Sequence, residues 1–475
     1  AAGPPPELAP AAGGVVVEGA YRLTGPGWEP AGGWWLGVHH REEAARGLAP
    51  EEDLWHAGQF TATLERAGDR AVVWAGASFD GPAPATARLE GAVAAARERG
   101  RRWVPLDRAA DQFVVTTAAG EPDVVAGYPW FGAWSRDTMI SYPGLFLTSD
   151  RAGASRAGTG RDLLAAYAAT LSDGMLANTA DTGRTEYNTA DATLWFVYAV
   201  DRHVAATGDT DLAAALLPAC DRLIQAHTAG TRYGIGVDPA DGLLRQGAPG
   251  QALTWMDARV DGVPVTARGG KPVEIDALWV NALAAVATLS ARTGADAGRW
   301  WERYAAARDA FRRTFPAPGG GLYDIAGDDP SPAGRALRPN QLLAYSLPYA
   351  PMDPDPAVLH AVGAALLTPL GLRSLAPTDP AYRGRHRGDP ADRDRAYHQG
   401  TVWPWLIGPY ADACRRARVP TDGLLDALLS HLGEWGLGSV SETADGDPPH
   451  AATGCPFQAW SVAELRRITA AGTDM

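Results

Sequence analysis

The sequence predicts a mainly α-helical protein, a closed toroid of paired helices that follows a partial N-terminal β domain. The chain has 475 residues, which is long enough to bury a large core. From about residue 110 onward, amphipathic helical segments alternate with long loops rich in Gly and Pro. No self-similar repeat of roughly 33–45 residues is present, which disfavours an open solenoid and leaves a closed arrangement of helices.

Residues 1–76 are predicted to form the partial β domain. Residues 15–24 are expected to form a short strand. Apolar and polar residues alternate over 59–65 and 71–74, and a turn over 67–69 suggests that these two segments form a hairpin. Residues 77–110 are expected to be a linker that contains an Ala- and Arg-rich helix over 86–102. The helical domain is then expected over 111–475.

Helices are predicted where apolar residues recur with the helical period, several of them after capping residues such as Asp209 and Thr421. Residues 379–395 alternate acids with arginines and predict a solvated loop. The expected helices cover 161–171, 191–207, 211–229, 276–293, 299–315, 356–367, 400–418, 422–435 and 458–470, with less regular candidates near 138–147 and 338–348.

Charge and composition exclude several classes of function. A formal net charge of −13 argues against a nucleic-acid partner. Neither a run of about 18 apolar residues nor a secretory signal is found, so no membrane association is expected. The odd number of cysteines, with no CxxC pair, argues against disulfides and zinc and favours a cytoplasmic location. His39-His40 lacks a third ligand, and no phosphate loop or GxGxxG occurs, so no metal or cofactor is expected.

The aromatic residues suggest a sugar-binding site. The chain has 17 Trp but only 9 Phe, and many of the tryptophans stand beside charged residues in segments punctuated by Gly and Pro. A flat indole covers the apolar face of a pyranose while charged groups bind its hydroxyls. The other expectation is that tryptophans fill cores, and this is expected for Trp34, Trp35, Trp300 and Trp301.

Two loop carboxylates are candidates for acid–base catalysis. Asp257 and Glu442 lie on separate Gly-flanked loops, from which one could protonate a glycosidic oxygen while the other activates water. The alternative is that both are solvated or cap helices, as most loop carboxylates do.

Residue types that the composition has almost eliminated give further candidates. Arg replaces Lys so widely that Lys271 is the only lysine, and only four asparagines remain. Lys271, Glu274 and Asn281 are expected to share one face at the start of a helix, although Glu274 could simply favour the helix N-terminus. The start of another helix repeats this pattern with Asn188, Asp191 and Trp195.

At these residues the sequence resembles the glucosidase part of glycogen debranching enzymes, the amylo-α-1,6-glucosidase family. Six segments in the family's order carry the resemblance over about three quarters of the chain. They are residues 126–140, 186–195, 254–257 with 270–275, 338–341, 397–405, and 441–447 with 458–461. Residues 30–76 are similar to the end of that family's N-terminal β domain.

The resemblance implies an (α/α)6 barrel and an inverting glycoside hydrolase without a cofactor. Asp257 would be the general acid and Glu442 the general base. Arg136 and Asp137 would hold the terminal glucose between walls formed by Trp130 and Trp403. The substrate would be a branched α-glucan or oligosaccharide, with no transferase activity. The same segments contain the remaining candidate sugar contacts, Trp255, His398, Gln399 and Trp460.

Two other functions fit the same residues. One is a different (α/α)6 glycosidase activity, glucoamylase-like or trehalase-like, and the other is a glycan-binding protein with an inactive site. The sequence leaves the oligomeric state open. It also predicts that Lys271→Arg impairs activity, because the only lysine falls within a segment of the resemblance.

Overall fold

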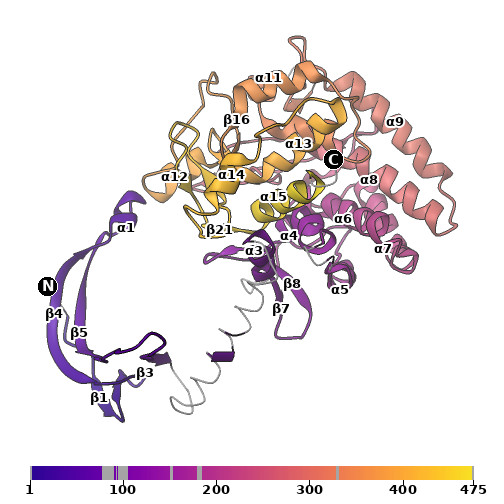
Figure 1. Cartoon of the computed structure of the whole chain (residues 1–475). Helices are drawn as coiled ribbons and strands as arrows, with labels where there is room; N and C mark the ends of the chain where they lie inside the picture. Colours follow the sequence, from indigo (N-terminus) through magenta and orange to yellow (C-terminus); the bar gives the residue numbers. More distant parts are fainter. Residues whose placement is uncertain are drawn as a thin grey trace. The chain divides into compact units, whose positions relative to one another are not determined.

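The computed structural model describes residues 3–76, 90–91, 94, 105–149, 153, 155–178, 185–327 and 331–472. The chain divides into two compact units, residues 1–102 with 387–390, and residues 103–386 with 391–475 (Figure 1). The helix expected over 86–102 falls almost entirely outside the described residues.

The N-terminal unit is built from antiparallel strands. One sheet has the order β1 (Leu8–Ala11), β2 (Gly14–Val17), β3 (Tyr21–Thr24) and β6 (Trp74–Gly76). The strand expected over 15–24 is thus two strands joined by a tight turn, in which Glu18 and Gly19 adopt positive φ.

The longest strands of this unit lie where the sequence shows no clear period. β4 (Glu29–His39) pairs with β5 (Glu51–Gln59), and Trp34 faces Trp55 across the pair with their rings in edge contact. A short helix, α1 (Arg41–Ala45), joins the two strands. The hairpin expected over 59–74 is wrong, because residues 60–73 form a loop in which Asp69 accepts backbone hydrogen bonds from Glu65 and Arg66.

The second unit is mainly helical, and its helices follow the predicted segments closely. Asp209 caps α7 by accepting a hydrogen bond from the Leu212 amide, as expected. The helices are α3 (Pro105–Phe113), α4 (Ser135–Tyr142), α5 (Ala157–Ala169), α6 (Ala192–Thr207), α7 (Thr210–Ala229), α8 (Val273–Arg292), α9 (Gly298–Thr314), α10 (Leu343–Ser346), α11 (Pro356–Leu366), α12 (Pro390–Tyr397), α13 (Ile407–Ala417), α14 (Asp426–His431) and α15 (Ala459–Gly472).

Two helical predictions and one loop prediction needed correction. The segment 400–418 begins with a strand, β18 (Val402–Trp403), and a 3-10 turn that starts at Pro404, so α13 starts only at Ile407. The helix expected over 422–435 shrinks to α14. The solvated loop expected over 379–395 contains the start of α12, which opens on Pro390, a residue suited to the first helical turn.

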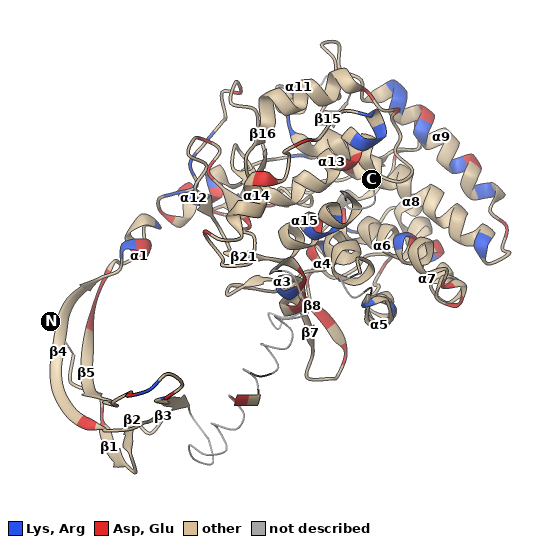
Figure 2. Cartoon of the chain, in the orientation of Figure 1, with Lys and Arg blue, Asp and Glu red and all other residues tan. Residues whose placement is uncertain are grey.

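The helices that line the core of this unit pack pairwise in a closed sequence. α4 contacts α6, α6 contacts α8, α8 contacts α10, α10 contacts α13, α13 contacts α15, and α15 returns to α4. α5, α7, α9 and α11 pack against members of this sequence from outside. α9 carries basic and acidic side chains along its length (Figure 2), as an outer helix does.

Short strands connect the helices and hold the loops between them. β8 (Pro122–Tyr128) pairs with β7 (Val114–Thr116), with β9 (Phe131–Ala133) and with β21 (Phe457–Gln458), so that both ends of this unit meet in one sheet. A second sheet has the order β16 (Leu367–Thr368), β17 (Gly371–Arg373), β18, β19 (Thr443–Ala444) and β20 (Ala452–Thr453). The other pairs are β10 (Gly236–Val237) with β11 (Leu244–Arg245), β12 (Arg259–Val260) with β13 (Val263–Pro264), and β14 (Lys271–Pro272) with β15 (Ile325–Ala326).

One described helix, α8, is long and apolar enough to cross a membrane. It is 94% buried inside the protein, and its neighbours α6, α7 and α9 cover it. Its apolar character is therefore that of a core helix.

Candidate active site

A helix start, a loop and the start of a strand place three carboxylates around one cavity of about 130 Å³ in the helical unit. Asp137 lies in the first turn of α4, Asp257 on the loop before β12, and Glu442 immediately before β19. All three line the cavity, together with Ala126, Phe131, Trp134, Arg136, Trp255, Tyr397, His398, Trp403, Gln458 and Trp460.

Asp257 is held by Arg136. The Nη1 of this arginine donates to Asp257 Oδ2 at 2.9 Å, and its Nε lies 2.9 Å from both carboxylate oxygens of Asp191. Burial raises the pKa of Asp257, although Arg136 opposes the shift. Because its side chain is still one-third exposed, a ligand that displaces water would raise the pKa further and favour a proton donor.

Glu442 has the surroundings of a general base. The Tyr397 hydroxyl donates to its Oε1, and the Cys455 amide donates to its Oε2 at 2.9 Å. Burial raises the pKa of Glu442 to about 7, while both donors favour the ionised form and limit that rise. The carboxylate is therefore fixed in orientation and titrates near neutral pH.

Asp137 is the third carboxyl that lines the cavity, and it is buried. Burial and the nearby carboxylates Asp257 and Glu442 raise its pKa to about 8, despite the neighbouring Arg136. Gln458 donates to its Oδ1 at 3.2 Å. A carboxyl that keeps its proton at neutral pH can both donate to and accept from the hydroxyls of a ligand.

Aromatic rings form the apolar wall of the cavity. His398 stacks on Trp403 with ring centroids 5.1 Å apart and planes 7° apart, and Trp255 meets both rings edge-on. Burial holds the pKa of His398 well below its usual range, so the ring is neutral. Its two nitrogens have no hydrogen-bond partner among the described residues, and neither does Trp460 Nε1. These atoms remain available to a polar ligand.

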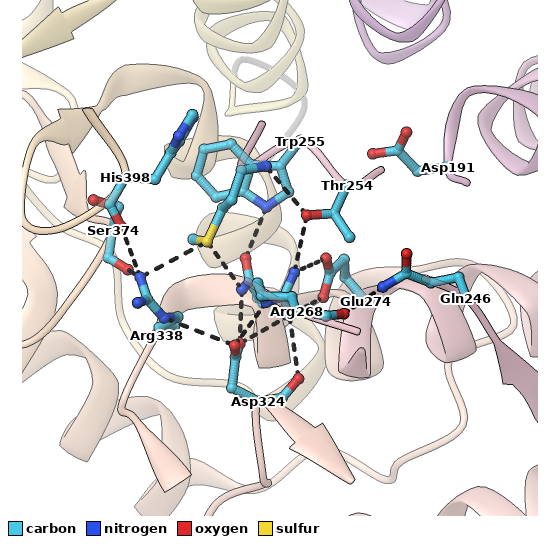
Figure 3. A network of polar contacts seen from close by, with 12 residues as sticks. Asp191, Gln246, Thr254, Trp255, Arg268, Glu274, Asp324, Arg338, Ser374 and His398 are labelled. Carbon is cyan, nitrogen blue, oxygen red and sulfur yellow. Dashed lines mark hydrogen bonds and ion pairs between the residues drawn. The ribbon is translucent and has the colours of Figure 1, made fainter. Parts of the chain in front are cut away.

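A buried polar network supports the segment that carries Asp257 (Figure 3). Arg268 lies between Glu274 and Asp324, donating to Glu274 Oε2 at 2.6 Å and to Asp324 Oδ2 at 2.7 Å. Asn340 donates to Asp324 at 2.7 Å and accepts from Trp255 Nε1 at 2.8 Å. A chain of buried hydrogen bonds therefore connects Arg268, through Asp324 and Asn340, to the indole of Trp255. This indole is two residues away from Asp257, the candidate general acid.

The structure brings together about half of the residues that the sequence singled out. Asp257, Glu442 and the expected contacts Arg136, Asp137, Trp255, His398, Trp403 and Trp460 all line the cavity. Trp130, expected as a wall, is half exposed and lies outside the lining. Asp191 does not line it either, but it positions Arg136.

Five other expected sugar contacts are engaged elsewhere. Glu274 pairs with Arg268, Asn281 accepts from the Tyr349 amide, and Gln399 accepts from Arg338. Asn188 exchanges hydrogen bonds with Asn178 and Glu186, and Trp195 packs edge-on against Tyr198. Each is buried or half-buried in a contact that builds the helical unit.

Lys271 is also away from the cavity. Its ammonium donates to Asp241 at 2.6 Å and lies 2.9 Å from Asp238, which fastens the start of α8 to the loop that precedes β11. Lys271 became a candidate because it is the only lysine, and in the structure it makes a contact that joins two segments of the helical unit. Glu274 and Asn281 both lie on α8, almost all of which is buried, but Lys271 precedes the helix in β14 and does not share a face with them.

Sequence reasoning missed Tyr397 as a partner of Glu442, although it stands beside His398 in a recognised segment. Phe131, Trp134 and Gln458 were overlooked in the same way. Their positions within the six segments were the available signal. Among the described residues, no group of three or more His, Cys, Asp or Glu side chains could hold a metal ion.

Comparison with known proteins places these features in a family. A sequence model described as amylo-alpha-1,6-glucosidase matches residues 108–467, and one described as glycogen debranching enzyme N terminal matches residues 17–70. The glycogen debranching enzyme of Saccharomyces cerevisiae is 25% identical over 461 aligned residues, which cover 72% of this chain. The match spans only 30% of the length of the yeast protein.

Solved structures share the fold at low identity. A GH63 mannosylglycerate hydrolase from Thermus thermophilus, in complex with glucose, superposes with a TM-score of 0.56 at 14% identity, covering 77% of this chain and 98% of its own. An uncharacterized conserved protein from the same organism gives the same TM-score and identity over 100% of its length.

Proposed function

Because the chain belongs to the amylo-alpha-1,6-glucosidase family, we propose that it is an inverting glycoside hydrolase that removes α-1,6-linked glucose branches from glycogen or limit dextrins. Glycoside hydrolysis follows from the family, whereas the linkage and the stereochemistry are the proposal. The closed sequence of packed helices supports an (α/α)6 barrel for the helical unit. The free, buried cysteines support a cytoplasmic location.

The observation that carries the proposal is the pair Asp257 and Glu442 in one cavity. Asp257, whose pKa is raised by burial, protonates the leaving oxygen. Glu442, held by Tyr397 and Cys455, accepts a proton from the water that attacks the anomeric carbon from the opposite face. Direct displacement by water, with no covalent intermediate, inverts the anomeric configuration.

The surrounding groups bind the sugar whose bond is broken. Arg136 and Asp137 bind its hydroxyls, while Trp255 and Trp403 cover its apolar faces.

A substrate panel tests the linkage. Glucose release should be fastest from a branched limit dextrin and slow from linear maltooligosaccharides and trehalose. Preference for maltooligosaccharides would point to a glucoamylase-like activity, and preference for trehalose to a trehalase-like one. Binding without any turnover would point to a glycan-binding protein.

Variants and product stereochemistry test the mechanism. Asp257→Asn and Glu442→Gln should each lower kcat by several orders of magnitude while retaining substrate binding, because each removes one proton-transfer group. Proton NMR of fresh product should show β-glucose first. Initial α-glucose would refute inversion, and wild-type turnover in either variant would refute that residue's role.

A further inference from the structure

A second and larger cavity lies directly behind the segment that carries Asp257. Its volume is about 460 Å³, within the roughly 300–1,000 Å³ typical of ligand sites. It is lined by residues 246–254, by Met256 and by Pro264, Thr266 and the stretch 267–270, all within the helical unit. Nothing in the proposed reaction uses this space.

The segment 254–257 is a wall shared by the two cavities. Thr254 and Met256 line the larger cavity, whereas Trp255 and Asp257 line the catalytic one. Successive residues of the segment therefore line alternate cavities. A ligand in the larger cavity therefore touches the backbone neighbours of the general acid without entering the catalytic site.

The lining favours an uncharged ligand. Arg268 is the only charged residue among the lining residues, and Glu274 and Asp324 neutralise it within the network of Figure 3. A charged ligand would find no counter-ion there, and its desolvation would go uncompensated. The cavity is otherwise formed by small residues such as Gly247, Ala248 and Gly250 and by backbone groups.

Two hydroxyls supply hydrogen-bonding capacity. Thr266 Oγ1 is buried and has no partner among the residues described, an arrangement that leaves its desolvation uncompensated unless a ligand or water pairs with it. Thr254 Oγ1 accepts from the Met256 amide at 3.3 Å and from Arg268 at 3.4 Å. Both contacts are donors, so the Thr254 hydroxyl proton can be donated to a ligand.

We propose that this second cavity binds the end of an α-glucan chain, two or three hexose units long, and thereby holds the segment 254–257 in its catalytic position. An α-glucan is uncharged and rich in hydroxyls, and the proposed substrate supplies it at high local concentration. The choice of ligand rests on the proposed function, but the cavity and its chemistry do not. Occupancy fixes Thr254 and Met256 and so orients Asp257.

Methionine NMR tests binding at this site. The chain has only five methionines, so 13C-methyl labelling of the full-length protein, with assignment by Met256→Leu, isolates a probe in the cavity wall. Maltotriose should shift the Met256 methyl signal in a saturable way. Ala248→Phe, which fills the cavity, should weaken this binding at least tenfold, and Thr266→Val should weaken it roughly two- to tenfold.

A matched variant and a second readout separate this proposal from the proposed function. Ala240→Phe adds the same ring at an exposed position outside the lining and should bind maltotriose as the wild type does. Hydrolysis of α-glucosyl fluoride should rise with maltotriose in the wild type but not in Ala248→Phe. An unshifted Met256 signal, or equal affinity in Ala248→Phe and Thr266→Val, overturns the second site. Failure to hydrolyse any glucoside overturns the proposed function instead.

Discussion

Glu442 sets the pH range in which the protein can work. A general base must be ionised, and burial raises the pKa of Glu442 to about 7. As the pH falls through this value the base is protonated, so kcat/KM should drop about tenfold per pH unit below it. Initial rates on a limit dextrin between pH 4 and 9 measure this fall, which is the acidic limb of the pH–rate profile. A limb centred near pH 4.5, the usual range of a glutamate, would contradict the buried environment.

Tyr397 adjusts that pKa through its hydrogen bond to Glu442. The bond favours the ionised carboxylate, so Tyr397→Phe should raise the pKa of Glu442 and move the acidic limb upward by about 1–2 pH units. Activity should be lost at pH 6 and largely recovered at pH 9. Tyr349→Phe removes a hydroxyl bonded to Asp201 and Thr288 and serves as the control with an unmoved limb. The same limb in both variants would show that Tyr397 only fills space.

The site residues that could be predicted are those whose chemistry is visible one residue at a time. A carboxylate in a Gly-flanked loop, or an indole close to it such as Trp255 near Asp257, can be recognised in the sequence, and these residues meet in the cavity. Tyr397 could not be assigned, because its role depends on Glu442, 45 residues away. Lys271 lies outside the cavity for the converse reason, because its rarity in the sequence says nothing about which carboxylates a cation will meet.

At the scale of elements, Lys271 joins the start of α8 to the loop that holds Asp238 and Asp241. Its hydrogen bond lowers the pKa of Asp238, so this stabilisation is present at neutral pH and is lost as the pH falls through that lowered value. Lys271→Met should reduce the free energy of unfolding at pH 7 by about 1–3 kcal/mol, whereas Lys271→Arg should keep most of the stability and activity.

Chemical denaturation of both variants measures the effect, and Arg245→Met is the matched control. Arg245 also reaches Asp238, at 3.5 Å, but its side chain is 64% exposed, so its loss should change stability by less than about 0.5 kcal/mol. Strong loss of activity in Lys271→Arg with unchanged stability would restore the sugar-contact role that the sequence suggested.

Helices were predictable where the period and a cap agreed, as in α7, because both signals are local. The strands were less predictable. β4 alternates poorly because Gly32, Gly33 and Gly37 interrupt it and its register shifts between Trp35 and Val38, so its identity depends on pairing with β5. α12 escaped prediction because its Asp- and Arg-rich sequence has no apolar stripe.

At the scale of the whole molecule, the division into two units places the boundary near residue 102. The boundary matters because α3 begins immediately after it and belongs to the helical unit. Phe113 of α3 is buried in the main core, and α3 packs against α15. The linker expected over 77–110 therefore ends inside a helix that the helical unit needs.

Two truncations test this boundary. A chain starting at Trp103 keeps α3 and should fold cooperatively. A chain starting at Thr117 loses Asp107, which accepts from Arg466 Nε at 2.7 Å. In that chain Arg466 would keep its hydrogen bonds to the Gly144 and Thr148 carbonyls. Its buried guanidinium, however, would have lost its carboxylate partner. Removing one partner of such a pair costs about 3–5 kcal/mol, to which the lost burial of Phe113 adds.

The substitution Asp107→Asn in the full-length protein separates two effects, the loss of the Asp107 charge and the loss of the whole of α3. In thermal unfolding, the midpoint of Asp107→Asn should lie between the midpoints of the two truncated chains. Of the two truncated chains, the one that starts at Trp103 should have the midpoint closer to that of the helical unit in the full-length protein. Equal stability of the chains from Trp103 and Thr117 would move the boundary beyond α3. Because α15 also contacts α4 and α13, loss of α3 should loosen the packing of α15 against these two helices, where the first and last helices of the closed sequence meet.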